Sequence, residues 1–184
     1  MRDCRALLAE IRRVQTEITW LTPFRDIGLT ANPGASEADL TRAERRIGRR
    51  LPPSYRRFLE DHDGWPRFFE GATLLGTAAL GQRQYEDLAQ AACEAAETPV
   101  PDVGPPSRYR PNARSLIPFG IDAQATTLFA FNPAVARSDG EYEVIAWINE
   151  IGVRRDSFED FLCLVLELCQ AEVEVAEQTA LKTA

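Results

Sequence analysis

The sequence is poor in the residues that most often carry catalytic or metal chemistry. It contains a single histidine, His62, and only four cysteines, no two of which have the C-x-x-C spacing of a zinc or redox site. It also lacks a Gly-rich phosphate loop and a serine in a G-x-S-x-G turn. We therefore expect no enzymatic activity, no metal and no other cofactor, although a Cys–His pair formed with His62 stays open as a minor alternative. We also expect reduced thiols at Cys4, Cys93, Cys163 and Cys169.

Long apolar runs are also missing. The longest, such as Phe161–Leu166 and Val144–Ile148, fall far short of the roughly 20 residues that cross a bilayer. Near the start, Arg2, Asp3 and Arg5 lead into an amphipathic pattern rather than the apolar segment of a signal peptide. We expect a cytoplasmic protein with no membrane partner.

Positive charge is in the minority. The 21 basic residues face 28 acidic ones, and the net charge of −7 disfavours binding to nucleic acid or anionic lipid. Arginines at positions 42, 45, 46, 49 and 50 fall opposite the apolar stripe of a predicted helix, so we assign them to a solvated face. Between Asp139 and Glu177, eleven carboxylates outnumber two arginines. This asymmetry would steer a basic protein toward the chain, and we expect no nucleic-acid partner.

The sequence pattern predicts several helices followed mainly by strands. Amphipathic spacing predicts a helix over residues 3–21, Ser36 can cap a second helix, and Pro53 suits the first turn of a third. Residues 68–75 are predicted to form a short strand pair or a strand and a loop, followed by an Ala-rich helix and a Pro-rich loop over 98–114. Strands are predicted over 115–121, 126–132 and 143–149, with a continuation near Val153, and a last helix from Ser157. This order predicts a single α+β domain, with a mostly antiparallel sheet packed on one face by helices.

We divide the chain into three parts. Residues 1–34 are expected to form an N-terminal helix and linker packed on the domain, and residues 35–170 the domain itself. The apolar stripe of the last helix breaks up beyond Ala171, so residues 171–184 are expected to fray.

Residues 35–65 carry a specific motif. A capped helix with an inward glutamate leads into an I-G-x-x-L-P corner, then into Y-x-x-F-L and a terminal Gly-Trp. The stretch resembles the opening of the SMI1/KNR4 family, also called the SUKH superfamily. Residues 117–120, 127–132 and 157–162 extend the resemblance over most of 35–168, with Ala125-Thr126 and His62-Asp63-Gly64 as departures from the family pattern. The motif residues are Glu44, Gly48, Leu51, Pro52, Tyr55, Phe58, Leu59, Gly64 and Trp65.

The same residues also have a structural explanation. The residue before a proline is driven out of helical geometry, so Leu51-Pro52 forces a corner between two helices. We predict that Leu51, Tyr55, Phe58 and Trp65 are buried where the helix pair seals against the sheet.

The family resemblance implies a non-enzymatic protein-binding domain. For a bacterial chain it implies an immunity protein that neutralises a cognate polymorphic toxin by direct binding, and this is the function we favour. The alternative is an intracellular regulatory or scaffold protein of the same family without a toxin partner. The acidic balance of the chain suits a basic toxin domain as the partner.

Two places are candidates for partner binding. Side chains alternate between two faces along the strand 141–149. Val144 and the residues two positions away on either side are predicted to face the core, whereas Glu141, Glu143, Ile145 and Trp147 lie on the other face. An aromatic side chain ringed by charge resembles the centre of an interface, unless Trp147 lies beneath the loop 98–114. The second candidate is the helix end with Glu60, Asp61 and Asp63, which is either solvated or a site for a cation or a partner's arginine.

Overall fold

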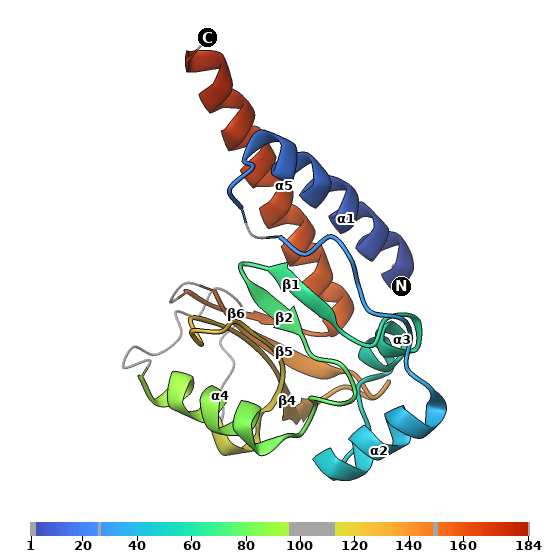
Figure 1. The fold of residues 1–184 in the computed structure, drawn as a ribbon. Helices are drawn as coiled ribbons and strands as arrows, with labels where there is room; N and C mark the ends of the chain where they lie inside the picture. Colours follow the sequence, from blue (N-terminus) through green and yellow to red (C-terminus); the bar gives the residue numbers. More distant parts are fainter. Residues whose placement is uncertain (1–2, 26, 96–112, 149–150, 184) are drawn as a thin grey trace.

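The computed structural model describes residues 3–25, 27–95, 113–148 and 151–183 (Figure 1). Within these ranges the centre is one sheet of six strands in the order β1-β2-β3-β4-β5-β6, and every neighbouring pair is antiparallel. The strands are β1 (Trp65–Phe69), β2 (Ala72–Leu74), β3 (Ile117–Ile121), β4 (Thr127–Ala136), β5 (Tyr142–Ile148) and β6 (Ile151–Arg155). The predicted α+β class with an antiparallel sheet is confirmed.

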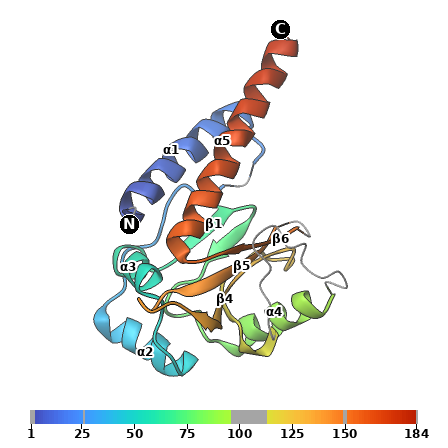
Figure 2. The same cartoon turned by 180° about the vertical axis from the view of Figure 1, so that it is seen from behind.

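The helices are α1 (Cys4–Leu21), α2 (Glu37–Ile47), α3 (Pro53–Asp61), α4 (Arg83–Ala95) and α5 (Phe158–Thr183), with a short 3-10 turn η1 (Ala113–Ser115). α1 and α5 lie side by side on one side of the sheet, whereas α4 lies on the opposite side in both views (Figures 1 and 2). The sequence predicts helices on one face of the sheet only, whereas in the structure α4 also covers the other face. Among the described residues, none of these helices combines the length and apolarity that a membrane crossing requires.

Local chemistry sets the helix boundaries, and the sequence predicts the starts of α2 and α3. The Ser36 hydroxyl accepts a hydrogen bond from the Asp39 N–H at the start of α2. Gly48 ends α2 with a φ of 75°, in the left-handed region that favours glycine. Pro53 occupies the first turn of α3, where its missing N–H leaves no hydrogen bond unmade.

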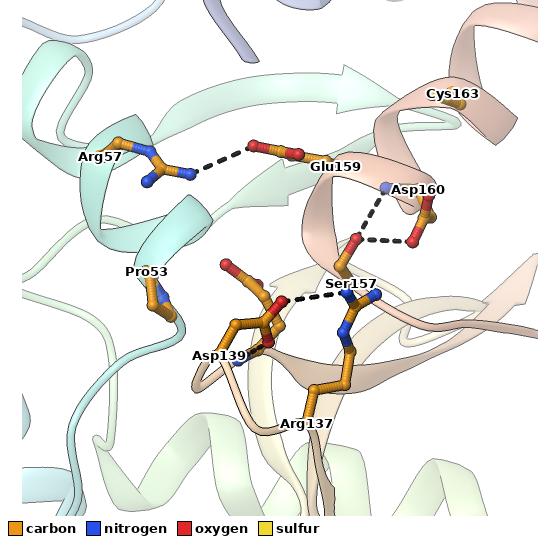
Figure 3. A pocket seen from close by; sticks show the side chains of 9 residues that line it. Pro53, Arg57, Arg137, Asp139, Ser157, Glu159, Asp160 and Cys163 are labelled. Carbon is orange, nitrogen blue, oxygen red and sulfur yellow. Dashed lines mark hydrogen bonds and ion pairs between the residues drawn. The ribbon is translucent and has the colours of Figure 1, made fainter. Parts of the chain in front are cut away.

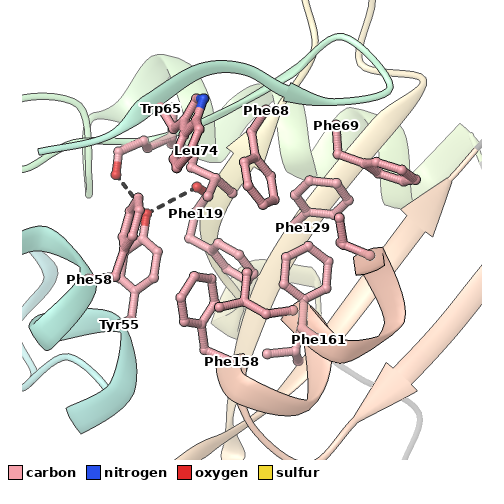
Figure 4. Packing of buried hydrophobic residues seen from close by; sticks show 14 of the residues in the cluster. Tyr55, Phe58, Trp65, Phe68, Phe69, Leu74, Phe119, Phe129, Phe158 and Phe161 are labelled. Atoms are coloured by element: carbon pink, nitrogen blue, oxygen red, sulfur yellow. Dashed lines mark hydrogen bonds between the residues drawn. The ribbon is translucent and has the colours of Figure 1, made fainter. Parts of the chain in front are cut away.

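Tyr55 of α3 lies at the centre of the core (Figure 4). Its ring centre is 4.9 Å from that of Phe158 and 5.2 Å from those of Phe119 and Phe131. Its hydroxyl donates a hydrogen bond to the Leu75 carbonyl over 2.7 Å, so the one polar atom of the ring is satisfied. The structure confirms the predicted burial of Leu51, Tyr55, Phe58 and Trp65.

The N-terminal helix shares this core. The apolar stripe of α1 is buried in the main cluster, and the side-chain amide of Gln15 donates to the carbonyl of Phe68 in β1. In the segment after α1, the Gly28 carbonyl accepts a hydrogen bond of 2.6 Å from the Trp65 indole N–H. These contacts fix α1 and the following segment to the sheet.

Two stretches differ from the prediction. The expected continuation near Val153 is a full strand, β6, which pairs along its length with β5. The tail over 171–184 was expected to fray, but α5 continues as helix to Thr183. Extending a helix that is already nucleated adds one backbone hydrogen bond for each residue fixed, so the break in the apolar stripe does not end it. Residues 98–112 of the predicted Pro-rich loop lie outside the described residues.

Candidate functional site

The strand face predicted to bind a partner is not open. The alternation itself is confirmed, because Val144 and Ala146 are buried in the main core. On the other face, however, Ile145 is fully buried, and Glu141 and Glu143 are each only 8% exposed. Trp147 is half-buried against a small cluster of Leu116, Ala130 and Ile145. The expectation of exposed charges here is wrong, because β5 lies inside the sheet between β4 and β6 and its second face is also packed.

The two glutamates of that face have fixed partners. Glu141 accepts hydrogen bonds from the backbone N–H and the hydroxyl of Ser54, at 2.7 and 2.6 Å. Glu143 accepts a hydrogen bond of 2.7 Å from the Asn132 side chain and pairs with Arg154 at 3.3 Å. Both carboxylates are therefore structural links between neighbouring elements.

Each of the three carboxylates at the acidic helix end has a different partner. Asp61 receives two hydrogen bonds of 2.6 Å from the guanidinium of Arg5 on α1, while Glu60 pairs with Arg56 on its own helix. Asp63 turns away and accepts a hydrogen bond of 2.9 Å from the Thr77 hydroxyl. Asp63 thus has different partners from Glu60 and Asp61, and among the described residues no group of three or more His, Cys, Asp or Glu side chains could hold a metal ion.

Three adjoining hollows follow α3 and form what we call the α3 groove. The first, of about 680 Å³, opens between the start of α3, the β4–β5 turn and the start of α5 (Figure 3). The second, of about 480 Å³, shares Arg57 and Glu159 with the first. The third, of about 450 Å³, lies against α1 and shares Arg5 and Asp61 with the second.

Two ion pairs mark the junctions of the groove. Arg57 of α3 meets Glu159 of α5 at 3.1 Å, where the first and second hollows join (Figure 3). The Arg5–Asp61 pair lies where the second and third hollows join. The hydrogen bond from Arg5 holds the pKa of the Asp61 carboxyl below its usual range. At each junction, therefore, a carboxylate is already paired with one arginine.

The lining of the groove is acidic. Carboxylates outnumber arginines by seven to four, and the arginines are Arg5, Arg12, Arg57 and Arg137. The carboxylates are Asp3, Glu60, Asp61, Asp139, Glu141, Glu159 and Asp160. The groove thus contains members of both predicted binding sites, Glu141 from the strand and Glu60 and Asp61 from the helix end.

Several groove residues were missed by sequence reasoning. Arg57 and Glu159 are 102 positions apart, and Arg5 and Asp61 are 56 apart. No local pattern links such residues, because their pairing depends on how α1, α3 and α5 come together. The only available signal was the excess of arginine and carboxylate on the polar faces of those helices.

The SMI1/KNR4 family model (SUKH-1) matches residues 34–163, well over half of the chain. The chain belongs to the SMI1/KNR4 family. No curated protein matches it at a significant level. The match contains the sheet, α2, α3 and the start of α5, so both walls of the first hollow belong to the SUKH domain. α1, which supplies Arg5 to the groove, lies outside the match.

The SUKH motif residues have structural roles. The Glu44 carboxylate accepts a hydrogen bond of 3.1 Å from the Leu51 N–H and so holds the corner between α2 and α3. Pro52 and Leu59 are buried beside that corner. Gly64 has a φ of 90°, and a Cβ there would lie 2.8 Å from the Leu74 carbonyl oxygen. The motif therefore builds the helix corner and the turn into β1 that shape the groove.

Proposed function

We propose that this SUKH-family chain is a cytoplasmic immunity protein that neutralises a cognate basic toxin by binding it in the α3 groove. The observation that carries the proposal is the acidic lining, with seven carboxylates against four arginines in three connected hollows. A carboxylate binds a guanidinium through two parallel hydrogen bonds, so arginines of a partner suit this lining.

The junction pairs support docking without refolding. Arg5 is largely exposed and Arg57 about half exposed, so the ion pairs they make contribute only about 0–1 kcal/mol each to stability. An arginine from the partner can therefore replace Arg5 on Asp61, or Arg57 on Glu159, at small cost. Occlusion of the toxin's active site by the bound domain requires no catalysis by this chain.

The groove also bears on the minor alternative of Cys–His chemistry. Cys4 lines the second hollow and His62 the third. Burial raises the pKa of the Cys4 thiol to about 12, the opposite of the change that makes a nucleophilic thiolate. This favours binding over catalysis.

Co-expression tests the function. The chain is expressed with a toxin encoded beside its gene, and we expect restored growth and a purifiable complex. Failure of both with the adjacent toxin would contradict the immunity role.

The groove is tested within that complex. Glu60→Gln with Asp61→Asn removes two groove charges, and we expect roughly tenfold weaker binding with a smaller salt dependence. The matched control is Glu10→Gln with Glu17→Gln, which removes two exposed carboxylates paired with Arg13 outside the groove. A complex that is stable but equally affected by both double variants would place the interface elsewhere.

A further inference from the structure

The Asp61 carboxylate in the α3 groove holds an arginine side chain of the chain itself. Nε of Arg5 donates a hydrogen bond to Oδ2 of Asp61 and Nη2 donates one to Oδ1, each over 2.6 Å. Two parallel hydrogen bonds between a planar guanidinium and a carboxylate are the geometry by which proteins recognise arginine. The two residues are 56 positions apart on α1 and α3, so the pairing is a tertiary contact between two surfaces.

The arginine of this pair is much more exposed than the carboxylate. The side chain of Arg5 is 76% exposed and that of Asp61 only 27%. An ion pair with so exposed a member adds little to stability. α1 is held to the core by its buried stripe, which begins with Cys4, Leu7 and Leu8. Arg5 can therefore leave Asp61 while the helix stays in place.

Three aromatic rings line the hollows that meet at Asp61. Phe58 lines the second hollow, and His62 and Trp65 line the third. The His62 ring centre is 6.1 Å from that of Phe58 and 5.7 Å from that of Trp65, so the rings form a row. A guanidinium stacks on aromatic rings, whereas the ammonium of lysine is a compact and strongly hydrated charge. Half-buried His62, next to Asp61 in the chain, is the more accessible member of this ring row.

Further negative charge faces the guanidinium. Asp3 and Glu60 line the second hollow together with Asp61. The pKa of Arg5 is raised above its ordinary value, first by the hydrogen bond to Asp61 and then by the charges of Asp61, Asp3 and Glu60. A cation at this position is thus favoured whether it comes from α1 or from another molecule.

The other junction of the groove is less suited to a second arginine. Arg57 reaches Glu159 through one nitrogen at 3.1 Å, and both residues belong to the SUKH domain (Figure 3). At the Asp61 junction only the carboxylate belongs to that domain, whereas Arg5 comes from α1, outside the family match. α1 therefore supplies an arginine to a carboxylate that the SUKH domain presents in its groove.

We propose that Asp61 and the ring row form a binding site for one arginine of the partner, and that Arg5 occupies this site while the partner is absent. This inference rests on the function proposed above and names the residue type that the partner inserts. Arg5 is an intramolecular competitor, which the incoming guanidinium displaces. A lysine is a poor substitute, because its ammonium cannot reproduce the planar fork that meets both carboxylate oxygens.

Small probes test the site without a toxin. Nα-acetylarginine amide and Nα-acetyllysine amide are titrated separately into the wild-type chain and into Arg5→Ala at equal ionic strength. NMR of the Asp61 carboxyl carbon reports binding. We expect the arginine probe to bind Arg5→Ala roughly two- to fivefold more tightly than the wild type, because an exposed ion pair competes only weakly. The lysine probe should bind more weakly than the arginine probe to both proteins.

Two further variants separate the fork from the charge. Arg13→Ala removes the same charge from the same helix, where Arg13 pairs with Glu10 and Glu17, and should leave the affinity for the arginine probe unchanged. Arg5→Lys keeps the charge without the fork, so the arginine probe should bind this variant more tightly than the wild type. Both arginines are exposed, so the thermal unfolding midpoints should stay near that of the wild type.

Three results would overturn the arginine site. These are equal affinities for the arginine and lysine probes, equal gains in Arg5→Ala and Arg13→Ala, and a chemical-shift change at Asp139 of the first hollow as large as that at Asp61. None of these readouts uses a toxin. Probe binding as expected, with no toxin complex on co-expression, would contradict the immunity role alone. A toxin complex from a chain that does not discriminate between the probes would contradict the arginine site alone.

Discussion

The carboxylate of Glu141 caps α3 by accepting hydrogen bonds from both the backbone N–H and the hydroxyl of Ser54. The N-cap position of α3 is Pro52, which offers no side-chain hydrogen bond to the first turn. Glu141 lies in the β4–β5 turn, 87 positions further along the chain, so the cap comes from outside the helix. The link ties the β4–β5 turn to α3 and shapes the first hollow of the α3 groove.

Removal of this cap should destabilise the fold. Glu141→Ala leaves the buried Ser54 N–H without its acceptor, and we expect a loss of about 1–3 kcal/mol in the free energy of unfolding. Urea denaturation measures it. Glu10→Ala, which removes an exposed carboxylate from α1, should change the free energy by about 0.5 kcal/mol or less. Equal midpoints for the two variants would show that Glu141 does not cap α3.

Phe58 should be among the most costly side chains to truncate. It is buried against the rings of Tyr55 and Phe158, and Phe58→Ala should lower the free energy of unfolding by about 3–5 kcal/mol because it leaves a cavity. Phe24→Ala, the same change at a fully exposed site, should have little effect on the free energy of unfolding. A Phe58→Ala midpoint within error of the wild type would contradict the core assignment.

Most of the fold could be predicted because its signals are local. Ser36, Gly48 and Pro53 each act on the backbone within a few residues, and the structure places helix boundaries at all three. The end of α5 could not be predicted in the same way. Its apolar pattern weakens near Ala171, whereas the helix continues to Thr183 with Val173 still packed against the core.

The site was harder to predict because it depends on tertiary contacts. Alternation correctly separated the two faces of β5, but it could not show that the face with Glu141 and Glu143 is packed. The prolines before Ser54 do indicate an N–H in need of an acceptor. They do not identify Glu141 as that acceptor.

The Arg5–Asp61 pair predicts that the stability of the fold depends on pH. The hydrogen bond from Arg5 lowers the pKa of Asp61 from its ordinary value of 3.8. A carboxyl whose pKa is lower in the folded state stabilises the fold above its unfolded pKa, and that contribution is lost as the pH falls through the folded pKa. Arg5→Ala should therefore raise the pKa of Asp61 toward 3.8, as measured by NMR titration of the carboxyl carbon.

Asp139 serves as the internal control for that titration. Its pKa is lowered mainly by a hydrogen bond from the backbone N–H of Glu141, so Arg5→Ala should leave the pKa of Asp139 unchanged. An unchanged pKa at Asp61, or equal changes at Asp61 and Asp139, would show that Arg5 does not set the charge of the groove at that junction.

The buried thiols should resist alkylation in the native protein. Burial raises the pKa of both Cys4 and Cys169 to about 12, so at pH 8 almost none of either thiol is the reactive thiolate. Mass spectrometry after iodoacetamide treatment should find both residues unmodified until urea unfolds the chain, and then fully modified. Rapid native labelling of Cys169 would contradict its burial in the main core. Rapid labelling confined to Cys4 would mean that its thiolate is accessible from the second hollow. That result would favour the Cys–His alternative, which the raised pKa of the Cys4 thiol otherwise disfavours.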